Sequence, residues 1–483
     1  MNSTKELRDI VNDALKWIQK HHDVTGAEVY ASSNELIVLR MSYASNIPNN
    51  ALEEAKSIDD FGIGIKVDFR DGKVGFGKSD SALDANAIKE AFEKAKKNSV
   101  KDEDFHSLPE PAGKGKLKKY HDEKIMKLDN EKAVEMSYDC LDSALNELGK
   151  KKFSGNVNMT GELDFLKERM AIASSTGIDN FDESTIAIGH LTTIFELEND
   201  ISGMWFDSAT SLKAFKSQAI GKNSVNKALS LMNPQRIESG TYKAVLGRLA
   251  MADILYSRFD VELSSMDVQS SPYLGMLDKK ISNYPLNIYD DGITPGLIGT
   301  KKITDEGIPT QKTQLVKDGV LVNLLADDYY AKKYKAQDSR YNNSNGFRFA
   351  GLGRAYYSEA STSATNVVVG KGKFSDEELI KEIKNGIYIG RIWYTYPING
   401  AASPDFSSTI RGDSYIIENG KIKCPLAPNI LRINDSIHHL LNNVIGLSKK
   451  QQATISWGEK AVVVTPEMAV SEIHLDRIGK GLY

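Results

Sequence analysis

One short stretch has the spacing of a phosphate-binding loop. Residues 72–79, GKVGFGKS, match the pattern G-x-x-x-x-G-K-S, in which backbone N–H groups surround a phosphate and the Lys-Ser pair begins a helix. Here, however, Asp71 and Gly72 are typical of a tight hairpin turn, and Val74 continues a strand-like alternation beyond it. Helical periodicity begins only near Asp84. The sequence therefore predicts a hairpin, and a P-loop nucleotide-binding protein is the less favoured alternative.

Side chains that bind transition metals are few and poorly spaced. The eight histidines include no two at i, i+3 or i, i+4, the spacings that place two imidazoles on one face of a helix. His21 and His22 point about 100° apart on a helix and cannot converge on one ion. Cys424 could act as a thiolate nucleophile with His438 or His439 as its base, an alternative that the sequence leaves open. No catalytic residue, cofactor site or metal site is predicted for this chain.

The run Asn287–Leu325 holds two adjacent carboxylates between two turn signals. Asp291-Gly292 and Asp318-Gly319 tolerate the left-handed backbone of a tight turn, so the run is predicted as a β-meander. On propensity alone, the residues between the turns are ordinary loop residues. The candidate residues of this loop are Asp305, Glu306, Gly307, Thr310 and Gln311.

This run resembles the signature of the TldD/PmbA (TldE) family, the metallopeptidase-related proteins once called modulators of DNA gyrase. The family pattern D-x-G followed by D-E-G-x-P-T-Q matches Asp290–Gly292, Asp305–Gly307 and Pro309–Gln311. A second block, Phe406–Gly420, resembles a family hairpin that ends in I-E-N-G. The resemblance covers nearly the whole chain and is strongest from about Pro272 onward.

The resemblance implies zinc-dependent proteolysis. In catalytic, TldD-type members, a His-Glu-x-x-x-His helix and a distant cysteine hold zinc, and a water fills the fourth position. The corresponding helix here, Leu249–Val261, contains no histidine. In the segment Trp457–Lys460, a tryptophan stands where the cysteine would be. The closest match is therefore the PmbA/TldE-type subunit, which lacks the zinc motif.

That match implies a non-catalytic subunit of a zinc-dependent peptidase complex. The expected partner is a TldD-type catalytic subunit in a heterodimer, with zinc in the partner, although the chain could also form a homodimer alone. The expected substrate is a peptide or an unfolded protein segment. Asp305, Glu306 and Gly307 would shape an inner loop near the shared cavity. A stand-alone metallopeptidase with an unrecognised site is the alternative.

The composition is that of an ordinary globular protein. The 483 residues are 41% hydrophobic and 26% charged, with a net charge of −4, which gives no electrostatic reason to bind nucleic acid. Two cysteines suggest a reducing compartment. The N-terminus has no apolar signal segment, and no stretch approaches the roughly 18 apolar residues of a membrane span. A cytoplasmic protein without nucleic-acid or membrane partners is expected.

The apolar pattern indicates an α+β fold. Two strand-plus-helix segments, residues 1–100 and 122–234, are expected to make an α/β N-terminal half, joined by an exposed linker at 101–121. Strands followed by a helix occur in both segments, without a residue-level match that would mark a repeat. From residue 235 to 483, Asp-Gly and Asn-Gly pairs recur and clear helices are few. That half is predicted as a large, mainly antiparallel β-rich domain.

Overall fold

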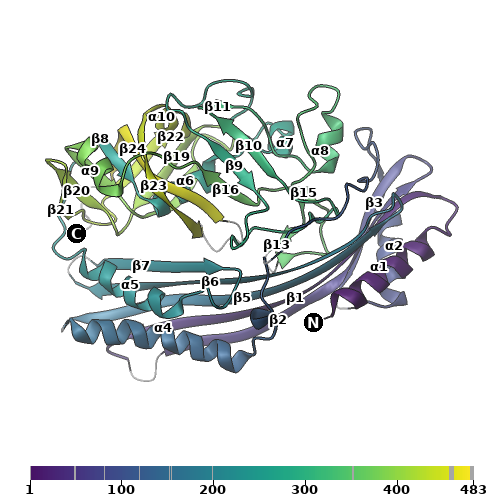
Figure 1. The fold of residues 1–483 in the computed structure, drawn as a ribbon, viewed down its shortest axis with the longest axis horizontal. Coiled ribbons are helices and arrows are strands. Elements are labelled where there is room, and N and C mark those ends of the chain that lie inside the picture. Colours follow the sequence, from purple (N-terminus) through teal and green to yellow (C-terminus); the bar gives the residue numbers. More distant parts are fainter. Residues whose placement is uncertain are drawn as a thin grey trace.

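The chain folds into two layers (Figure 1). The structure is a computed structural model, and it describes residues 2–47, 51–80, 82–118, 120–151, 153, 155–197, 200–350, 353–455 and 462–478. The N-terminal half builds a long, curved sheet with helices on its outer face, and the β-rich C-terminal half packs on the opposite face. The predicted α+β class is confirmed.

The first layer is a seven-stranded antiparallel sheet in the order β4-β3-β2-β1-β5-β6-β7. Its strands are β1 (Val24–Ala44), β2 (Ala51–Phe69), β3 (Lys73–Asp80), β4 (Val100–Lys101), β5 (Asn156–Ser174), β6 (Asp179–Glu196) and β7 (Ile201–Ala209). β1 and β5 pair at the centre, from Glu28 opposite Ser174 to Ala44 opposite Asn158. The predicted segments 1–100 and 122–234 therefore share one sheet.

Each half of this layer repeats the same succession of elements. The helices are α1 (Thr4–Ile18), α2 (Ala85–Lys97), α3 (Glu123–Met126), α4 (Asn130–Lys150) and α5 (Ser217–Leu229). A helix, three strands and a helix occur as α1-β1-β2-β3-α2 and again as α4-β5-β6-β7-α5. Because β1 and β5 pair antiparallel, the two units are arranged about an approximate two-fold axis through the middle of the sheet. The repeat is visible in the topology although the sequence does not mark it.

The helices cover the outer face of the sheet with their apolar sides. The predicted capping box at the start of α1 is confirmed, since Ser3 and Glu6 exchange hydrogen bonds there. Leu7 and Val11 of α1 and Phe92 of α2 pack on β1 and β2 in one core cluster. α4 and α5 bury a second cluster against β5 and β6. Two helix pairs therefore stiffen the two halves of one sheet.

The second layer is built on a thirteen-stranded sheet that is antiparallel except where β16 pairs with β24 and β8 with β17. Its strands are β8 (Gly240–Leu246), β9 (Ile288–Asp291), β10 (Lys312–Lys317), β11 (Val320–Leu321), β16 (Asn366–Val369), β17 (Gly386–Ile389), β18 (Ile392–Pro397), β19 (Asp405–Ile410), β20 (Tyr415–Glu418), β21 (Lys421–Pro425), β22 (Leu431–Ser436), β23 (Val444–Ile455) and β24 (Val462–Arg477). β24 pairs with four others, β8, β16, β22 and β23, and so occupies the middle of the layer.

Short elements complete the second layer. Its helices are α6 (Arg248–Arg258), α7 (Leu263–Asp267), α8 (Asp328–Lys333), α9 (Asp376–Ile383) and α10 (Ile437–Asn442). Two small strand pairs join β12 (Gly346–Phe347) to β15 (Ser361–Thr362) and β13 (Phe349–Ala350) to β14 (Gly353–Arg354). The hairpin predicted at Asp318-Gly319 joins β10 to β11. None of the described helices combines the length and the apolar character needed to cross a membrane.

Part of the predicted linker 101–121 is buried. The side chain of Leu108 is enclosed, and Lys332 of α8 donates hydrogen bonds from Nζ to the carbonyls of Ser107 and Leu108 at 3.1 and 2.8 Å. The linker is therefore tied to the second layer rather than exposed along its whole length.

The phosphate-loop pattern forms a hairpin, as predicted. β2 and β3 pair across a turn at Asp71-Gly72, and α2 begins only at Ala85. The glycines of the pattern serve packing, because a β-carbon at Gly75 would lie 2.0 Å from the Ala95 carbonyl oxygen. One at Gly77 would lie 2.1 Å from that of Ala91. Helix α2 therefore packs directly on the backbone of β3. This close contact leaves no space for a phosphate at the glycines of the pattern.

Two substitutions in this hairpin should separate packing from nucleotide binding. Lys78→Ala removes an exposed ion pair with Asp80 (Nζ to Oδ1, 2.7 Å) and is expected to change the free energy of unfolding by less than about 1 kcal/mol. Gly77→Ala should cost about 1–3 kcal/mol because α2 must move. Calorimetric titration with ATP should show no binding to either variant or to the parent chain. Micromolar ATP binding that Lys78→Ala abolishes would contradict the packing explanation.

Candidate functional site

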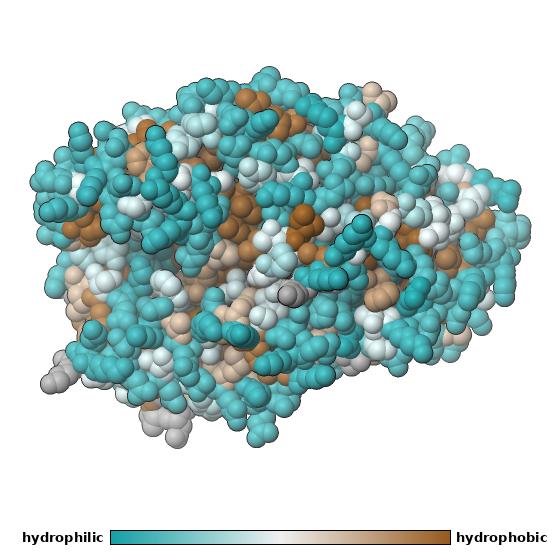
Figure 2. Space-filling model, viewed as in Figure 1, coloured by the Kyte–Doolittle hydropathy of each residue, from teal (hydrophilic) through white to brown (hydrophobic). Residues whose placement is uncertain are grey.

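A cleft of about 320 Å³ lies between the two layers. The first layer contributes one face of β5, β6 and β7, and the second contributes α6, β18 and the end of β23. The lining residues are Glu162, Asp164, Ile188, His190, Met204, Leu249, Asp253, Arg391, Ile392, Trp393 and Ile455. Figure 2 shows hydrophobic residues gathered along the boundary between the layers, where the surface is hollowed. A partly apolar groove of this kind is the usual setting of a ligand site.

Strand pairing brings the polar groups of the cleft together. Glu162 of β5 lies opposite His190 of β6, and Asp164 lies opposite Ile188. Residues two apart on a strand share a face, so all four side chains point into the cleft. Burial lowers the pKa of His190, although nearby Glu162 opposes this shift. Asp253 of α6 completes the polar part of the wall.

The remaining polar groups of the cleft already have partners in the protein. Asp253 Oδ2 accepts a hydrogen bond from Thr395 Oγ1 at 2.8 Å. Arg391 donates from Nη2 to the carbonyl and the hydroxyl of Ser202 at 2.9 and 2.7 Å. The arginine therefore ties the second layer to β7 at the rim of the cleft. Because Asp253 and Arg391 are hydrogen-bonded within the protein, we assign them a role in shaping the cavity and not in acid–base chemistry.

The predicted loop carboxylates lie outside this cleft. Asp305 is fully enclosed between the layers, where its Oδ1 accepts a hydrogen bond from the Tyr30 hydroxyl at 2.8 Å. Its Oδ2 accepts one from the backbone N–H of Arg348, also at 2.8 Å. Tyr30 belongs to β1, so the loop of the second layer is anchored on the central strand of the first. Asp305 is a structural anchor in this arrangement.

The other four loop candidates are also held by local contacts. Glu306 lines a small cavity of about 30 Å³, and its Oε2 accepts a hydrogen bond from the backbone N–H of Asp328 at 3.1 Å. Gly307 has φ +78°, and a β-carbon there would lie 2.5 Å from Ile178 Cγ2. Thr310 donates its hydroxyl proton to backbone carbonyls, and Gln311 is exposed. None of the five lines the larger cleft.

A buried arginine joins this loop to the first layer. Arg354 is fully enclosed and forms ion pairs with Asp305 (Nε to Oδ1, 2.6 Å) and with Asp182 of β6 (Nη1 to Oδ2, 2.8 Å). Its Nη2 donates to the carbonyl of Ile303 at 2.8 Å. Charges removed from water need partners of this kind, because unpaired they would be strongly destabilising.

Two more buried ion pairs lie beside it. Lys301 pairs with Glu168 of β5 and donates to the Ser184 hydroxyl at 3.0 Å. Burial opposes ionisation of Glu168, but Lys301 and Ser184 outweigh it and lower the pKa of this carboxyl to about 2. Arg348 pairs with Glu28 of β1 at 2.5 Å. The two layers are therefore joined by a network of enclosed charges as well as by apolar contacts.

Comparison with known proteins identifies the family. The model of the PmbA/TldA metallopeptidase C-terminal domain matches residues 239–477. The model of the PmbA/TldA metallopeptidase domain 1 matches residues 46–99. The chain belongs to the PmbA/TldD family.

Similar proteins agree with the assignment. An uncharacterized protein of Methanocaldococcus jannaschii, MJ0231, is 28% identical over 386 residues, which cover 76% of this chain and 82% of that protein. A metalloprotease TldD homolog of Buchnera aphidicola is 27% identical over 225 residues, 45% of this chain and 43% of that protein. The chain thus aligns with less than half of that metalloprotease. The crystal structure of TldE from Thermococcus kodakarensis superposes with a TM-score of 0.80 at 21% identity, covering 98% of this chain and 100% of that one. That likeness shows the fold.

The cleft of this PmbA/TldD chain does not fit a zinc ion. Helix α6, which holds most of the segment Leu249–Val261 expected to correspond to the family's metal-binding helix, presents Leu249 and Asp253 to the cavity. Among the described residues, no three histidine, cysteine or carboxylate side chains that converge within ligand distance lie in the cleft. The segment Trp457–Lys460, where the cysteine would stand, lies outside the described residues. The carboxylates of the cleft, on Glu162, Asp164 and Asp253, and its one histidine, His190, therefore do not converge into the usual three-ligand site.

The alternative nucleophile, Cys424, has no base beside it. It lies on β21 at the edge of the second sheet, and no hydrogen bond to its thiol occurs among the described residues. His439 instead directs Nδ1 to Asp435 Oδ1 at 2.7 Å. His438 packs its ring against Tyr273. The thiolate–imidazole pair considered from the sequence is therefore not formed.

Sequence reasoning missed two groups of polar residues. The cleft residues Glu162 and His190 look like ordinary positions of alternating strands until β5 and β6 are paired in register. The second group is Asp435, His439 and His474, and its third member comes near the others only through the pairing of β24 with β22. The Asp-x-x-x-His spacing at 435–439 was the available signal.

Proposed function

We propose that this chain is the non-catalytic, TldE-like subunit of a zinc-dependent peptidase and that it pairs with a TldD-type catalytic chain. The observation that carries the proposal is helix α6. It faces a cleft between the layers, yet it presents Leu249 and Asp253 where a catalytic relative would need histidines. A chain that has the cleft but lacks the metal ligands could form part of the wall of a chamber that it shares with the catalytic chain.

The mouth of the cleft supports a role in holding an extended chain or a partner. β18 is an edge strand that pairs with β19. Its aromatic side chains are unusually exposed, with Trp393 at 39%, Tyr394 at 59% and Tyr396 at 40%. Trp393 also lines the cleft. Exposed aromatic rings beside a groove are typical of surfaces that bind other proteins or peptides.

The expected substrate is a peptide or an unfolded protein segment, and the expected location is the cytoplasm. Both cysteines are free thiols, and burial raises the pKa of Cys140 to about 12. Such a thiol is chemically inert at neutral pH, which fits a chain that needs no disulfide. The competing candidate is a stand-alone metallopeptidase, and a homodimer is the competing assembly.

Reconstitution with a TldD-type chain tests the proposal. We expect size exclusion with light scattering to show a one-to-one complex, and the mixture to cleave unfolded peptides in a zinc-dependent way that neither chain shows alone. Changing the His-Glu-x-x-x-His of the partner should abolish cleavage, whereas Cys424→Ala and His438→Ala here should leave most of it. Chelator-sensitive cleavage by this chain alone would favour the stand-alone enzyme, and failure to form any complex would refute the partnership.

A paired substitution tests the aromatic strand within the same assay. Changing Tyr394 and Tyr396 together to alanine should reduce complex formation or cleavage by about tenfold or more, since clustered exposed aromatics dominate binding energies. Tyr138→Ala is the matched control, because this tyrosine is 45% exposed on α4, on the outer face of the first layer. Equal effects of the two changes would remove β18 from the proposed contact surface.

A further inference from the structure

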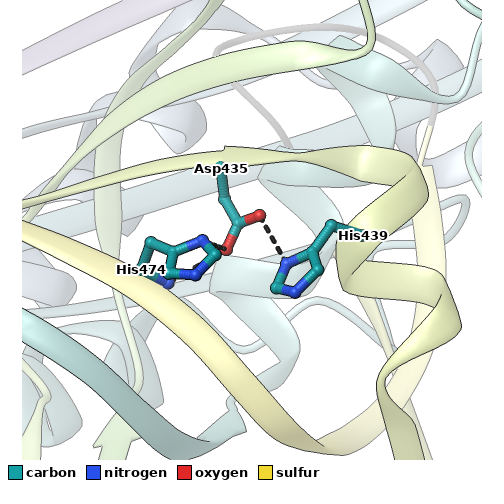
Figure 3. A group of neighbouring side chains, drawn as sticks. All are labelled: Asp435, His439 and His474. Carbon is teal, nitrogen blue, oxygen red and sulfur yellow. Dashed lines mark hydrogen bonds and ion pairs between the residues drawn. The ribbon is translucent and has the colours of Figure 1, made fainter.

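Two histidines and a carboxylate meet on the second layer, away from the first layer (Figures 1 and 3). Asp435 lies near the end of β22, His439 lies on α10, and His474 lies on β24. One ligand atom from each can be chosen so that all lie within 4.8 Å of one another. Two consecutive elements, β22 and α10, and the later strand β24 therefore present nitrogen and oxygen donors to one point.

The carboxylate is fixed before any ligand arrives. The side chain of Asp435 is only 1% exposed. Its Oδ1 accepts hydrogen bonds from the backbone N–H of Ser436 and from His439 Nδ1, both at 2.7 Å. Its Oδ2 accepts one from the backbone N–H of His474 at 3.0 Å. A buried, hydrogen-bonded carboxylate of this kind loses little conformational freedom on binding an ion.

The imidazoles are also held in place. His474 Nδ1 lies 3.4 Å from Asp435 Oδ2, and the two histidine rings stack at a centroid distance of 4.8 Å with 14° between their planes. Both Nδ1 atoms thus face the same carboxylate (Figure 3). The other nitrogen of His439, Nε2, lies 3.6 Å from Glu472 Oε2. A carboxylate at the far nitrogen is the usual way in which proteins direct a histidine toward a metal.

We propose that Asp435, His439 and His474 bind a divalent first-row transition metal ion through one carboxylate oxygen and the two Nδ1 atoms. Ligands of a tetrahedral zinc ion at about 2.0–2.1 Å are roughly 3.3 Å apart. His439 Nδ1 lies 2.7 Å from Asp435 Oδ1, and His474 Nδ1 lies 3.4 Å from Oδ2 of the same carboxylate. One atom from each residue already lies within 4.8 Å of the others, and side-chain rotation has to bring one oxygen and the two nitrogens around a single ion. Two imidazoles favour zinc, copper or nickel over magnesium and calcium, which prefer oxygen ligands.

This site is separate from the cleft and from the proposed peptidase function. His474 is 48% exposed at its side chain, so the ion keeps positions open to water or to a group from another molecule. The ion would connect α10, β22 and the central strand β24. Metal binding would therefore stabilise the second layer and release the protons that ligation displaces.

Zinc titration of the metal-free chain tests the site. The chain is stripped with chelator, dialysed at pH 7.5, and titrated with Zn²⁺ against a chromophoric competitor. We expect a site with micromolar or tighter affinity, and His439→Ala and His474→Ala should each weaken it at least about tenfold. Both variants leave the buried Asp435 and its backbone hydrogen bonds in place, and circular dichroism should confirm that they fold.

Two control variants and a second ion make the result specific. His22→Ala removes an exposed histidine elsewhere, and His121→Ala disrupts a second group formed by His121, Glu123 and Glu183. Neither should weaken the site. Co²⁺ should give visible d–d absorption that disappears in His474→Ala. The proposal is overturned if the parent chain shows no binding below 100 μM Zn²⁺, if the two site variants bind as tightly as the parent, or if a control variant loses the same affinity.

Discussion

Replacing Arg354 with alanine is expected to lower the free energy of unfolding by about 3–5 kcal/mol. Arg354 is fully enclosed and neutralises two buried carboxylates, those of Asp305 and Asp182. Its removal would leave Asp305 with hydrogen bonds from Tyr30 and the Arg348 backbone but no ion pair among those described for it. Asp182 would keep only the more distant Lys302, at 3.7 Å, as a described cationic partner. Because Asp305 belongs to the second layer and Asp182 to the first, the loss should weaken the contact between the layers.

Urea denaturation measures this loss, and an exposed arginine provides the control. Arg340 makes ion pairs of similar length with Asp278 and Asp338, at 2.7 and 2.5 Å, but its side chain is 41% exposed. Arg340→Ala should therefore change the free energy of unfolding by no more than about 1 kcal/mol. Arg354→Lys, which keeps the charge but loses the planar fork, should lie between the two. If Arg354→Ala and Arg340→Ala lower the free energy of unfolding by similar small amounts, the buried ion pairs of Arg354 contribute no more to stability than exposed ones.

Stability is also expected to fall as the pH rises from about 5 to 8. Burial raises the pKa of Glu306 well above its ordinary range, and neighbouring Asp327 and Asp328 raise it further. Burial likewise raises the pKa of Asp327 to about 6. The folded chain thus holds protons that the unfolded chain releases. Stabilisation is complete below the ordinary carboxyl pKa and is lost as the pH rises through the raised values.

The size of this effect follows from the shift of Asp327. One pKa unit corresponds to about 1.4 kcal/mol, so the shift of Asp327 from 3.8 to about 6 is worth roughly 3 kcal/mol between strong acid and pH 8. About half of that stabilisation should be lost between pH 5 and pH 8. The counter-charges that face this cluster, Lys66 and Arg348, reduce the loss. The pKa of His190 is lowered by burial, so this residue acts in the opposite direction, but only below about pH 6.5. Glu168, whose pKa is about 2, loses its stabilisation only in stronger acid.

The variant Glu306→Gln tests how much the carboxylate cluster of Glu306, Asp327 and Asp328 contributes to this pH dependence. The variant removes one of the interacting acids, so its loss of stability between pH 5 and 8 should be smaller than that of the parent chain. Glu103→Gln, at an exposed position, should keep the parent profile. Chemical denaturation at several pH values gives both curves. Parallel curves for the parent and Glu306→Gln would mean that this carboxyl does not titrate in the folded state.

Local signals in the sequence predicted local structure well. The Asp71-Gly72 turn and the capping box at Ser3 were predicted correctly, because each depends on residues within a few positions of one another. The antiparallel β-rich character of the C-terminal half was also predicted, from recurring turn pairs. These features need no knowledge of distant contacts.

The candidate sites depend on distant contacts and could not be predicted in the same way. Asp305 was singled out in the sequence, but its partner Tyr30 lies 275 residues away. The cleft needs the register of β5 against β6 and the docking of α6 over them. His474 joins Asp435 only because β24 passes beside β22. A sequence pattern can identify such residues individually, but the pairing of the strands determines which of them are in contact.

The position of β24 has a consequence for how the protein matures. This strand lies in the middle of the second sheet, yet the ribosome makes it after every other described strand. The first layer can form during synthesis, whereas the second must wait for β24 to thread between β8, β16, β22 and β23. Until then, the inner face of the first sheet, including Leu36 and Val38, stays uncovered. Slow, non-local pairing with exposed apolar surface is the situation in which chains aggregate or require chaperones.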